Sequence, residues 1–167
     1  MSLTDIDLHF MHLAIQQAAR APIAGEVPIA AVLVHDGHIL ASAHNLRETL
    51  QDPTAHAEMI VIRQAAEHVR SWRLTEATLY VTLEPCPMCA GAIVQSRISR
   101  LVFGAWDPKA GACGSIFDIP TERRLNHRVD VTGGVLERES QALLQNFFRA
   151  KRNGDQEKNN DRTTPDR

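Results

Sequence analysis

The sequence predicts an α/β protein: a single three-layer α/β/α domain with a mixed five-stranded sheet. Two observations predict this fold class. An Asp-Gly pair at 36–37 separates two apolar runs, which is typical of an antiparallel β-hairpin. Farther along the chain, helical and β-type patterns alternate, which implies parallel strands joined by helices. The 167 residues, 44% of them hydrophobic, can bury one sizeable core, and the length does not require a second domain.

The first predicted helix follows Thr4, which can cap it, and runs to about Arg20 along a stripe of apolar residues at helical spacing. Pro22 ends this helix. The two strands of the hairpin are predicted over 28–35 and 38–43. Asp-Gly between such strands favours a type I′ turn, so the strands should be antiparallel.

The middle of the chain predicts a second helix that carries two candidate functional residues. A polar loop occupies 45–53, and Thr54 can cap a helix over about 55–69. His56 and Glu58 are therefore expected in the first turn of this helix.

A buried third strand is predicted over 77–83, where the chain is rich in β-forming residues and is bounded by Pro85. Pro87 suits the start of a helix that runs to about Ser96, because a missing amide proton costs little there. A fourth strand over 100–105 follows this helix, so it should pair in parallel with the third.

The last part of the chain predicts a Gly-rich loop over 106–115, a short fifth strand over 128–132 and an amphipathic helix over about 136–152. Residues 1–152 therefore form the predicted domain. The polar residues 153–167 are expected to be a disordered tail.

Composition and charge exclude several classes of protein. No apolar run approaches the roughly 20 residues of a membrane-spanning helix, and acidic and histidine side chains interrupt the N-terminus, unlike a signal peptide. We therefore expect a cytoplasmic protein that does not bind a membrane. The net charge of −2 does not indicate a nucleic-acid partner by itself. Three cysteines favour metal or redox chemistry over a disulfide framework.

Cys86 and Cys89 are the first indication of a metal site. At i and i+3 on one helical face, their Cβ atoms would lie about 5–6 Å apart, so two thiolates could share one tetrahedral zinc ion. A helix N-terminus also favours the thiolate form, which is the form that binds metal. Taken alone, the Cys-x-x-Cys spacing is equally compatible with a thioredoxin-like redox pair or with two buried thiols.

His56 favours the metal site over these alternatives. Together with the two cysteines it makes a set of three ligands, which leaves the fourth tetrahedral position for water, and open zinc sites are usually catalytic. Cys113 lies in a Gly-rich loop far along the chain. It is the residue that could close the site into a structural cluster of three cysteines and one histidine.

Glu58 is interpreted as an acid/base group near the metal. Positions i and i+2 of a helix point roughly 200° apart, so His56 and Glu58 would not face one metal side by side. Zinc lowers the pKa of a bound water toward about 7, and a nearby carboxylate can take its proton and pass it to a leaving group. The residues thus predict hydrolysis at an electron-poor carbon. A first-turn carboxylate can also simply complement the helix dipole.

The His-x-Glu run at 56–58 followed by Pro-Cys-x-x-Cys at 85–89 is the signature of zinc nucleobase deaminases, a group that includes cytosine, guanine and deoxycytidylate deaminases. Over about residues 5–152 the chain resembles the bacterial tRNA-specific adenosine deaminases. The runs that carry this resemblance are Asn45, 53–58, 79–86, 88–92, 96–98, 104–109, 126–128 and 147–149.

The resemblance implies a cytidine-deaminase-like fold and a set of roles at the reaction centre. His56, Cys86 and Cys89 would hold one zinc ion per subunit, Glu58 would transfer protons, and Asn45 would hydrogen-bond the purine edge. The resemblance also implies a homodimer.

For RNA binding, the resemblance implies that Asp107, Lys109 and Arg149 contact the anticodon stem-loop of a tRNA. Two residues depart from the family pattern. Ala30 stands where the family usually has glycine, and Trp106 occupies a variable position of the substrate loop, which bears on substrate preference.

The expected reaction is zinc-dependent hydrolytic deamination of adenosine to inosine at the wobble position, the first anticodon position, of a tRNA, which the resemblance suggests is an arginine tRNA. An alternative is a deaminase of a free base or nucleotide, of the guanine or cytosine type, that uses the same residues. A third reading is a non-catalytic nucleic-acid-binding module with a structural zinc, which would require a fourth protein ligand.

Overall fold

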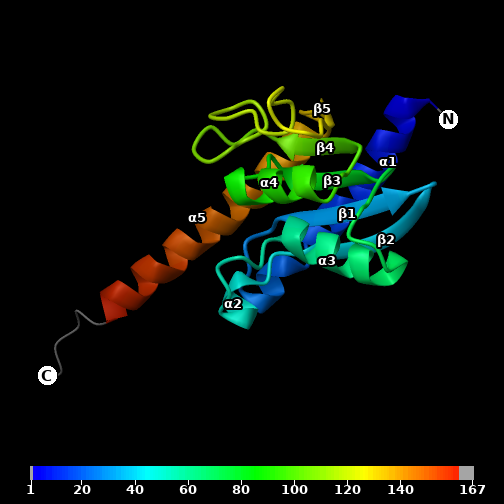
Figure 1. The fold of residues 1–167 in the computed structure, drawn as a ribbon. Helices are drawn as coiled ribbons and strands as arrows, with labels where there is room; N and C mark the ends of the chain where they lie inside the picture. The colour runs from blue at the N-terminus through cyan, green and yellow to red at the C-terminus, as the bar shows by residue number, and fades with distance from the viewer. Residues whose placement is uncertain (1, 162–167) are drawn as a thin grey trace, which may run out of the picture.

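The computed structural model describes residues 2–161 and contains a five-stranded mixed sheet between two layers of helices (Figure 1). The strand order is β2-β1-β3-β4-β5. β1 is antiparallel to both β2 and β3, whereas β3, β4 and β5 are parallel. The strands are β1 (Ala30–His35), β2 (His38–His44), β3 (Thr78–Leu83), β4 (Arg100–Ala105) and β5 (Asp130–Thr132). The predicted fold class is confirmed.

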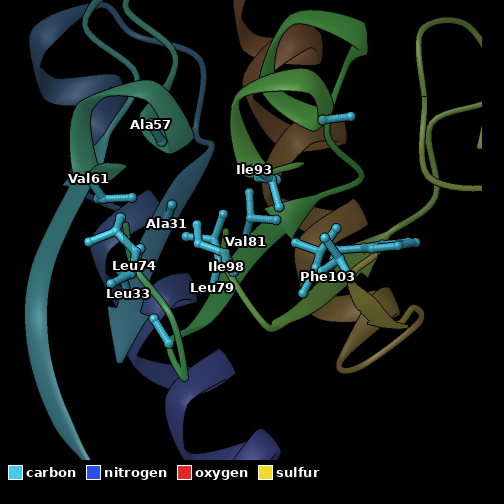
Figure 2. Close-up of a cluster of buried hydrophobic side chains, with 14 of the residues drawn as sticks. Ala31, Leu33, Ala57, Val61, Leu74, Leu79, Val81, Ile93, Ile98 and Phe103 are labelled. Carbon is cyan, nitrogen blue, oxygen red and sulfur yellow. The ribbon is translucent and has the colours of Figure 1, made fainter. Parts of the chain in front are cut away.

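Two helices cover each face of the sheet. The helices are α1 (Leu3–Ala18), the 3-10 turn η1 (Ala21–Ala24), α2 (Arg47–Leu50), α3 (Ala57–Val69), α4 (Pro87–Gln95) and α5 (Glu137–Asp161). α3 and α4 pack on one face, and α1 and the first part of α5 pack on the other. Alternate strand residues supply the two cores: Leu33 and Leu79 face α3 and α4, whereas Val32 and Tyr80 face α1. Figure 2 shows the first of these cores.

Local signals in the sequence located the strands well. Asp36 and Gly37 both have positive φ angles, of 49° and 74°, which confirms the type I′ turn. β4 has the predicted bounds, and each end of the other strands lies within two residues of its predicted position. The parallel pairing of β3 with β4 is also confirmed.

Both predicted N-terminal caps are wrong. α1 is capped by Ser2, whose hydroxyl accepts the N–H of Asp5 while the Asp5 carboxylate accepts the N–H of Ser2, so Thr4 lies inside the helix. α3 begins at Ala57, not near residue 55. The N–H and hydroxyl of Thr54 both donate to Asp52, so Thr54 closes a turn before the helix instead of capping it.

α5 continues to Asp161, whereas the prediction ended this helix near residue 152 and made 153–167 a disordered tail. Residues 153–161 are helical because they contain no proline and include good helix formers such as Gln156, Glu157 and Lys158. Figure 1 shows this C-terminal part of α5 projecting away from the sheet. The rest of the predicted tail, 162–167, lies outside the described residues. Within residues 2–161, no helix has the length and hydrophobicity that a membrane span requires.

Candidate active site

Three side chains that can bind a metal converge where α3 and α4 begin. His56 immediately precedes α3, Cys86 immediately precedes α4, and Cys89 lies in the first turn of α4. Pro87 occupies the start of α4, as predicted, because that position needs no N–H donor. His56 has an extended backbone and is not in the first turn of α3, so that part of the prediction is wrong. Even so, the three predicted ligands come together.

The distances within this group fit zinc. The Nδ1 atom of His56 lies 3.6 Å from the Sγ atom of Cys86 and 3.5 Å from that of Cys89, and the three ligand atoms all lie within 4.8 Å of one another. Tetrahedral ligands at the usual zinc–nitrogen and zinc–sulfur distances would be separated by about 3.6 Å. The geometry therefore matches the ligand set of a zinc ion without rearrangement.

Cys113 does not belong to this group. Its thiol is buried and lies 3.9 Å from the carbonyl oxygen of Pro85. Among residues 2–161, the set of metal-ligating side chains that includes His56 contains three members and no fourth. The arrangement is therefore that of an open site, which argues against a purely structural zinc.

The two thiols of the site differ in proton affinity. Hydrogen bonds from Cys89 and then His56 lower the pKa of Cys86 to about 4, although burial opposes this. The hydrogen bond to Cys86 and burial raise the pKa of Cys89 instead. The two thiols therefore do not ionise equally, because a proton shared between them favours the thiolate of Cys86. A metal must displace this proton, so metal affinity will fall in acid.

Glu58 is close to the metal group but is not a member of it. It lies in the first turn of α3, its side chain is only 4% exposed, and burial raises the pKa of its carboxyl. A carboxyl group with a raised pKa can hold a proton and release it near neutral pH. Its position fits an acid/base group beside a metal.

A cavity of about 240 Å³ opens beside these residues. Six separate segments line it: the chain before β1, the chain after β2 through the start of α2, the start of α3, the chain from the end of β3 to α4, the loop after β4, and α5. The lining residues are Val27, Ile29, Asn45, Arg47, His56, Glu58, Leu83, Glu84, Cys86, Asp107, Ala110 and Phe148. The catalytic candidates and the metal group thus share one accessible space.

Comparison with known proteins identifies the family. Residues 6–152 match the model of the MafB19-like deaminase family. The chain is also 56% identical, over 140 residues, to the tRNA-specific adenosine deaminase of Bacillus subtilis, a match that covers 84% of this chain and 87% of that protein. The chain belongs to the tRNA-specific adenosine deaminases. The predicted resemblance is confirmed.

Solved structures agree with this assignment of the deaminase. One from a study of A-to-I editing by tRNA:A34 deaminases at the wobble position superposes with a TM-score of 0.78 at 49% identity, covering 81% of this chain and 99% of that chain. A guanine deaminase from Nitrosomonas europaea has a TM-score of 0.71 at 23% identity, covering 84% of this chain and 83% of that chain. At that identity the likeness extends to the fold alone.

Asn45 of the deaminase caps α3, a role that the sequence did not indicate. It is 5% exposed, and its Oδ1 accepts the N–H of Ala57 at 2.8 Å, so Asn45 supplies the cap that was assigned to Thr54. Because the oxygen is used in this way, the amide NH₂ group is what Asn45 can offer to a ligand in the cavity.

The residues predicted to contact RNA fall in two classes. Asp107 lines the cavity, and its carboxylate accepts the N–H groups of Lys109 and Ala110. Lys109 and Arg149 are exposed and do not line the cavity. Trp106 also lies outside the lining and packs edge-to-face on Phe103, with ring centroids 4.7 Å apart.

Sequence reasoning did not predict several lining residues, among them Phe148, Arg47 and Glu84. Phe148 lies in the predicted amphipathic helix, where an apolar side chain suggests packing, but its side chain is 42% exposed. Arg47 begins the short helix α2, which has no recognisable pattern in the sequence. Glu84 precedes the cysteine motif but has no periodicity or spacing that separates it from an ordinary strand end.

Proposed function

We propose that this deaminase hydrolyses adenosine to inosine at the wobble position of a tRNA, and that its substrate is an arginine tRNA. The observation that carries the proposal is the group of His56, Cys86 and Cys89 beside the buried Glu58, in a cavity lined by Asn45. The identity to tRNA-specific adenosine deaminases supports the tRNA substrate. The arginine tRNA rests on the family resemblance.

The metal proposed for this site is zinc, one ion per subunit, held by His56, Cys86 and Cys89. When bound, zinc supplies Lewis-acid activation of a water molecule for hydrolysis. Glu58 takes the proton of the attacking water and delivers it to the amino group, which departs as ammonia. Burial of Glu58 favours its protonated form, so it can carry the proton between the two positions.

Asn45 positions the base. Its NH₂ group can donate to a ring nitrogen of adenine while its oxygen stays bound to Ala57. The ring of Phe148 offers a surface against which an unstacked loop base can pack. An anticodon loop already splays its bases, so little energy is needed to bring one into the cavity.

RNA outside the cavity is proposed to contact Asp107, Lys109 and the exposed face of α5. Arg149 and Arg152 are three residues apart on that helix, so they lie on one face, and both are exposed. Phe148 connects this face to the cavity. Replacing both arginines by glutamine should make the logarithm of RNA affinity fall less steeply with the logarithm of salt concentration. The change in slope should correspond to the loss of about two phosphate contacts. An unchanged salt dependence would remove α5 from the RNA surface.

We also propose that the enzyme is a homodimer and acts in the cytoplasm. The solvent side of α4 supports a protein partner: Met88, Gly91 and Ala92 are only half-buried, and a Cβ at Gly91 would meet nothing within 4 Å. Sedimentation of the purified protein would test the dimer directly.

The test of the proposed function measures ammonia release from three kinds of substrate. The first is the anticodon stem-loop of an arginine tRNA, and the second is the anticodon stem-loop of a different tRNA that also has adenosine at the wobble position. The third is a set of free bases and nucleosides. Activity on the first alone supports the full proposal. Equal activity on both loops would remove the arginine preference, and activity only on free compounds would favour the guanine or cytosine type of deaminase.

Asn45→Asp is the sharpest variant for the base contact. The aspartate retains an oxygen for the N–H of Ala57 but lacks the NH₂ donor. It should keep the thermal stability of the wild type and lose affinity for adenosine, whereas Asn45→Ala should lose both. Unchanged affinity in Asn45→Asp would show that Asn45 is only a helix cap.

A further inference from the structure

Glu84 is a buried carboxylate for which the proposed mechanism has no use. Its side chain is 2% exposed, at the point where β3 ends. One carboxylate oxygen, Oε1, accepts the hydroxyl of Ser115 at 2.6 Å. The other, Oε2, is buried and has no hydrogen-bond partner among the described residues. Keeping such a group in the fold is costly, so its surroundings indicate what it does.

Glu84 lies under the loop over 106–115. One backbone hydrogen bond attaches this loop to the chain after β3, from the N–H of Ala112 to the carbonyl oxygen of Pro85 at 2.8 Å. The N–H of Glu84 donates, also at 2.8 Å, to Ala105, the last residue of β4 before the loop. The Glu84–Ser115 bond adds a side-chain attachment at the far end of the loop. The loop is therefore fastened to the strand that leads to the metal ligands.

Gly111 shows how closely the loop is fitted to Glu84. A Cβ atom at Gly111 would overlap Oε2 of Glu84 and would lie 2.6 Å from the carbonyl oxygen of Asp107. Gly111 does not have a positive φ angle, so its backbone alone would accept alanine. The absence of a side chain is required by Glu84 and by the tight turn, in which Gly111 donates its N–H to Asp107.

The turn held in this way is the one that brings Asp107 into the cavity. The Asp107 carboxylate is fixed by the N–H groups of Lys109 and Ala110, so turn and carboxylate move together. Glu84 contributes to the lining of the cavity, but Ser115 occupies one of its carboxylate oxygens and the other is buried against Gly111, so neither oxygen is free to bind a substrate.

We propose that Glu84 is a positioning residue: it holds the 106–115 loop through Ser115 and Gly111 and thereby sets where Asp107 meets the RNA substrate. This inference rests on the proposed function of the site. It predicts that Glu84 affects substrate binding and leaves the chemical step alone.

The test measures KM and kcat on an anticodon stem-loop for the zinc-loaded enzyme and its Glu84→Ala, Glu84→Gln and Ser115→Ala variants. Glu84→Ala and Ser115→Ala should raise KM on the order of tenfold, equivalent to one lost hydrogen bond, with kcat nearly unchanged. Glu84→Gln keeps an oxygen for the Ser115 hydroxyl and should recover most of the lost affinity. Ser115→Ala keeps the test valid if Glu84→Ala does not fold.

Two outcomes would overturn the proposal. If kcat falls in Glu84→Ala while KM and zinc content stay constant, Glu84 acts on the reaction itself. If neither KM nor kcat changes in Glu84→Ala and Ser115→Ala, the loop does not depend on Glu84.

A double-mutant cycle tests the contact with Gly111. Gly111→Ala must displace Glu84 and should raise KM as Glu84→Ala does. In the Glu84→Ala background the methyl group no longer overlaps a carboxylate and only its approach to the Asp107 carbonyl oxygen remains, so its additional effect should be smaller. Fully additive effects would show that Gly111 and Glu84 act independently.

Amide hydrogen exchange over 106–115 separates this proposal from the proposed function. Faster exchange in Glu84→Ala and Ser115→Ala, but not in Glu84→Gln, supports the positioning role even if the wild-type enzyme does not deaminate the stem-loop. Unchanged exchange in an enzyme that does deaminate it would reject the positioning role alone.

Discussion

Asp7 and Glu58 are buried to the same extent, 5% and 4% exposed, but in opposite surroundings. Asp7, in α1, receives two hydrogen bonds from Arg100, of 2.6 and 2.7 Å, and a third from the hydroxyl of Tyr80 at 2.9 Å. Glu58 pairs with no lysine or arginine among residues 2–161, and its ionisable neighbours are the metal-binding residues. Asp7 is therefore paired with a cationic side chain, whereas Glu58 has no such partner among the described residues.

The difference shows that a buried carboxylate can serve the structure or the chemistry, depending on its partners. The carboxylate of Asp7 is matched by a planar guanidinium, and its hydrogen bonds link α1 to β3 and β4. Burial raises the pKa of Glu58 because nothing comparable offsets it. When such a group is ionised, it lowers the stability of the fold. Its raised pKa allows it to exchange protons near neutral pH.

The largest expected effect is that of Glu58→Gln, which should lower the deamination rate by on the order of 10²–10⁴-fold. Zinc content, measured by atomic absorption, should not change. The raised pKa means that the fold loses stability from Glu58 as the pH rises above the unfolded value, so the neutral glutamine should leave thermal stability equal or higher at pH 8. Loss of zinc in Glu58→Gln would show that Glu58 is a metal ligand, and the comparison with Asp7 would then no longer apply.

Asp7→Ala should have the opposite profile. It removes the buried partner of the Arg100 guanidinium, which keeps only Thr132 at 3.2 Å and the exposed Asp130 at 3.7 Å, and it should destabilise the fold by roughly 3–5 kcal/mol, as measured by urea unfolding. The rate per folded, zinc-loaded molecule should stay the same. The double variant Asp7→Ala/Arg100→Met removes both charges and should recover much of the stability. A large loss of rate in folded Asp7→Ala would contradict the structural role.

Tyr80→Phe tests the neutral part of the same network. Burial, followed by the hydrogen bond to Asp7, raises the pKa of Tyr80, so its hydroxyl remains a donor over the working pH range. Removal of one hydrogen bond that leaves Asp7 paired with Arg100 should cost about 1 kcal/mol. A cost as large as that of Asp7→Ala would mean that the tyrosine, and not the arginine, satisfies the aspartate.

Glu26→Gln is expected to have a small, pH-dependent effect. Burial alone would raise the pKa of Glu26, but hydrogen bonds from Thr49 and Glu48 outweigh it, and the pKa is lowered. Its contribution is therefore present above the ordinary value of 4.5 and is lost as the pH falls through the lowered value. Glu26→Gln should cost about 1 kcal/mol at pH 7 and less near pH 3, in thermal melts at both values. An equal cost at both pH values would show that the charge is not involved.

The strands were predictable because their signals are local. The Asp36-Gly37 turn and the apolar runs beside it determine the hairpin through neighbouring residues alone. The cap of α3 was not predictable in this way, because it comes from Asn45, twelve residues before the N–H of Ala57 that it accepts. No spacing rule connects two residues that only the folded loop brings together.

The candidate site divides in the same way. Ligand chemistry and spacing predicted that His56, Cys86 and Cys89 would meet, since each lies at or next to a helix start. Phe148 reaches the cavity because α5 crosses the sheet near Gly104, where a Cβ would lie 2.4 Å from the hydroxyl oxygen of Ser140. That path depends on tertiary packing and leaves no pattern in the sequence.

The position of Trp106 makes it a candidate intrinsic fluorescence probe. Trp106 precedes Asp107 in the chain, and its indole packs against Phe103. The only other tryptophan, Trp72, lies before β3, with the guanidinium of Arg73 over its ring. In a Trp72→Phe variant, the remaining emission would come from Trp106 alone. The RNA binding proposed next to Asp107 could then be followed in real time by intrinsic fluorescence, without a label on the protein or on the RNA.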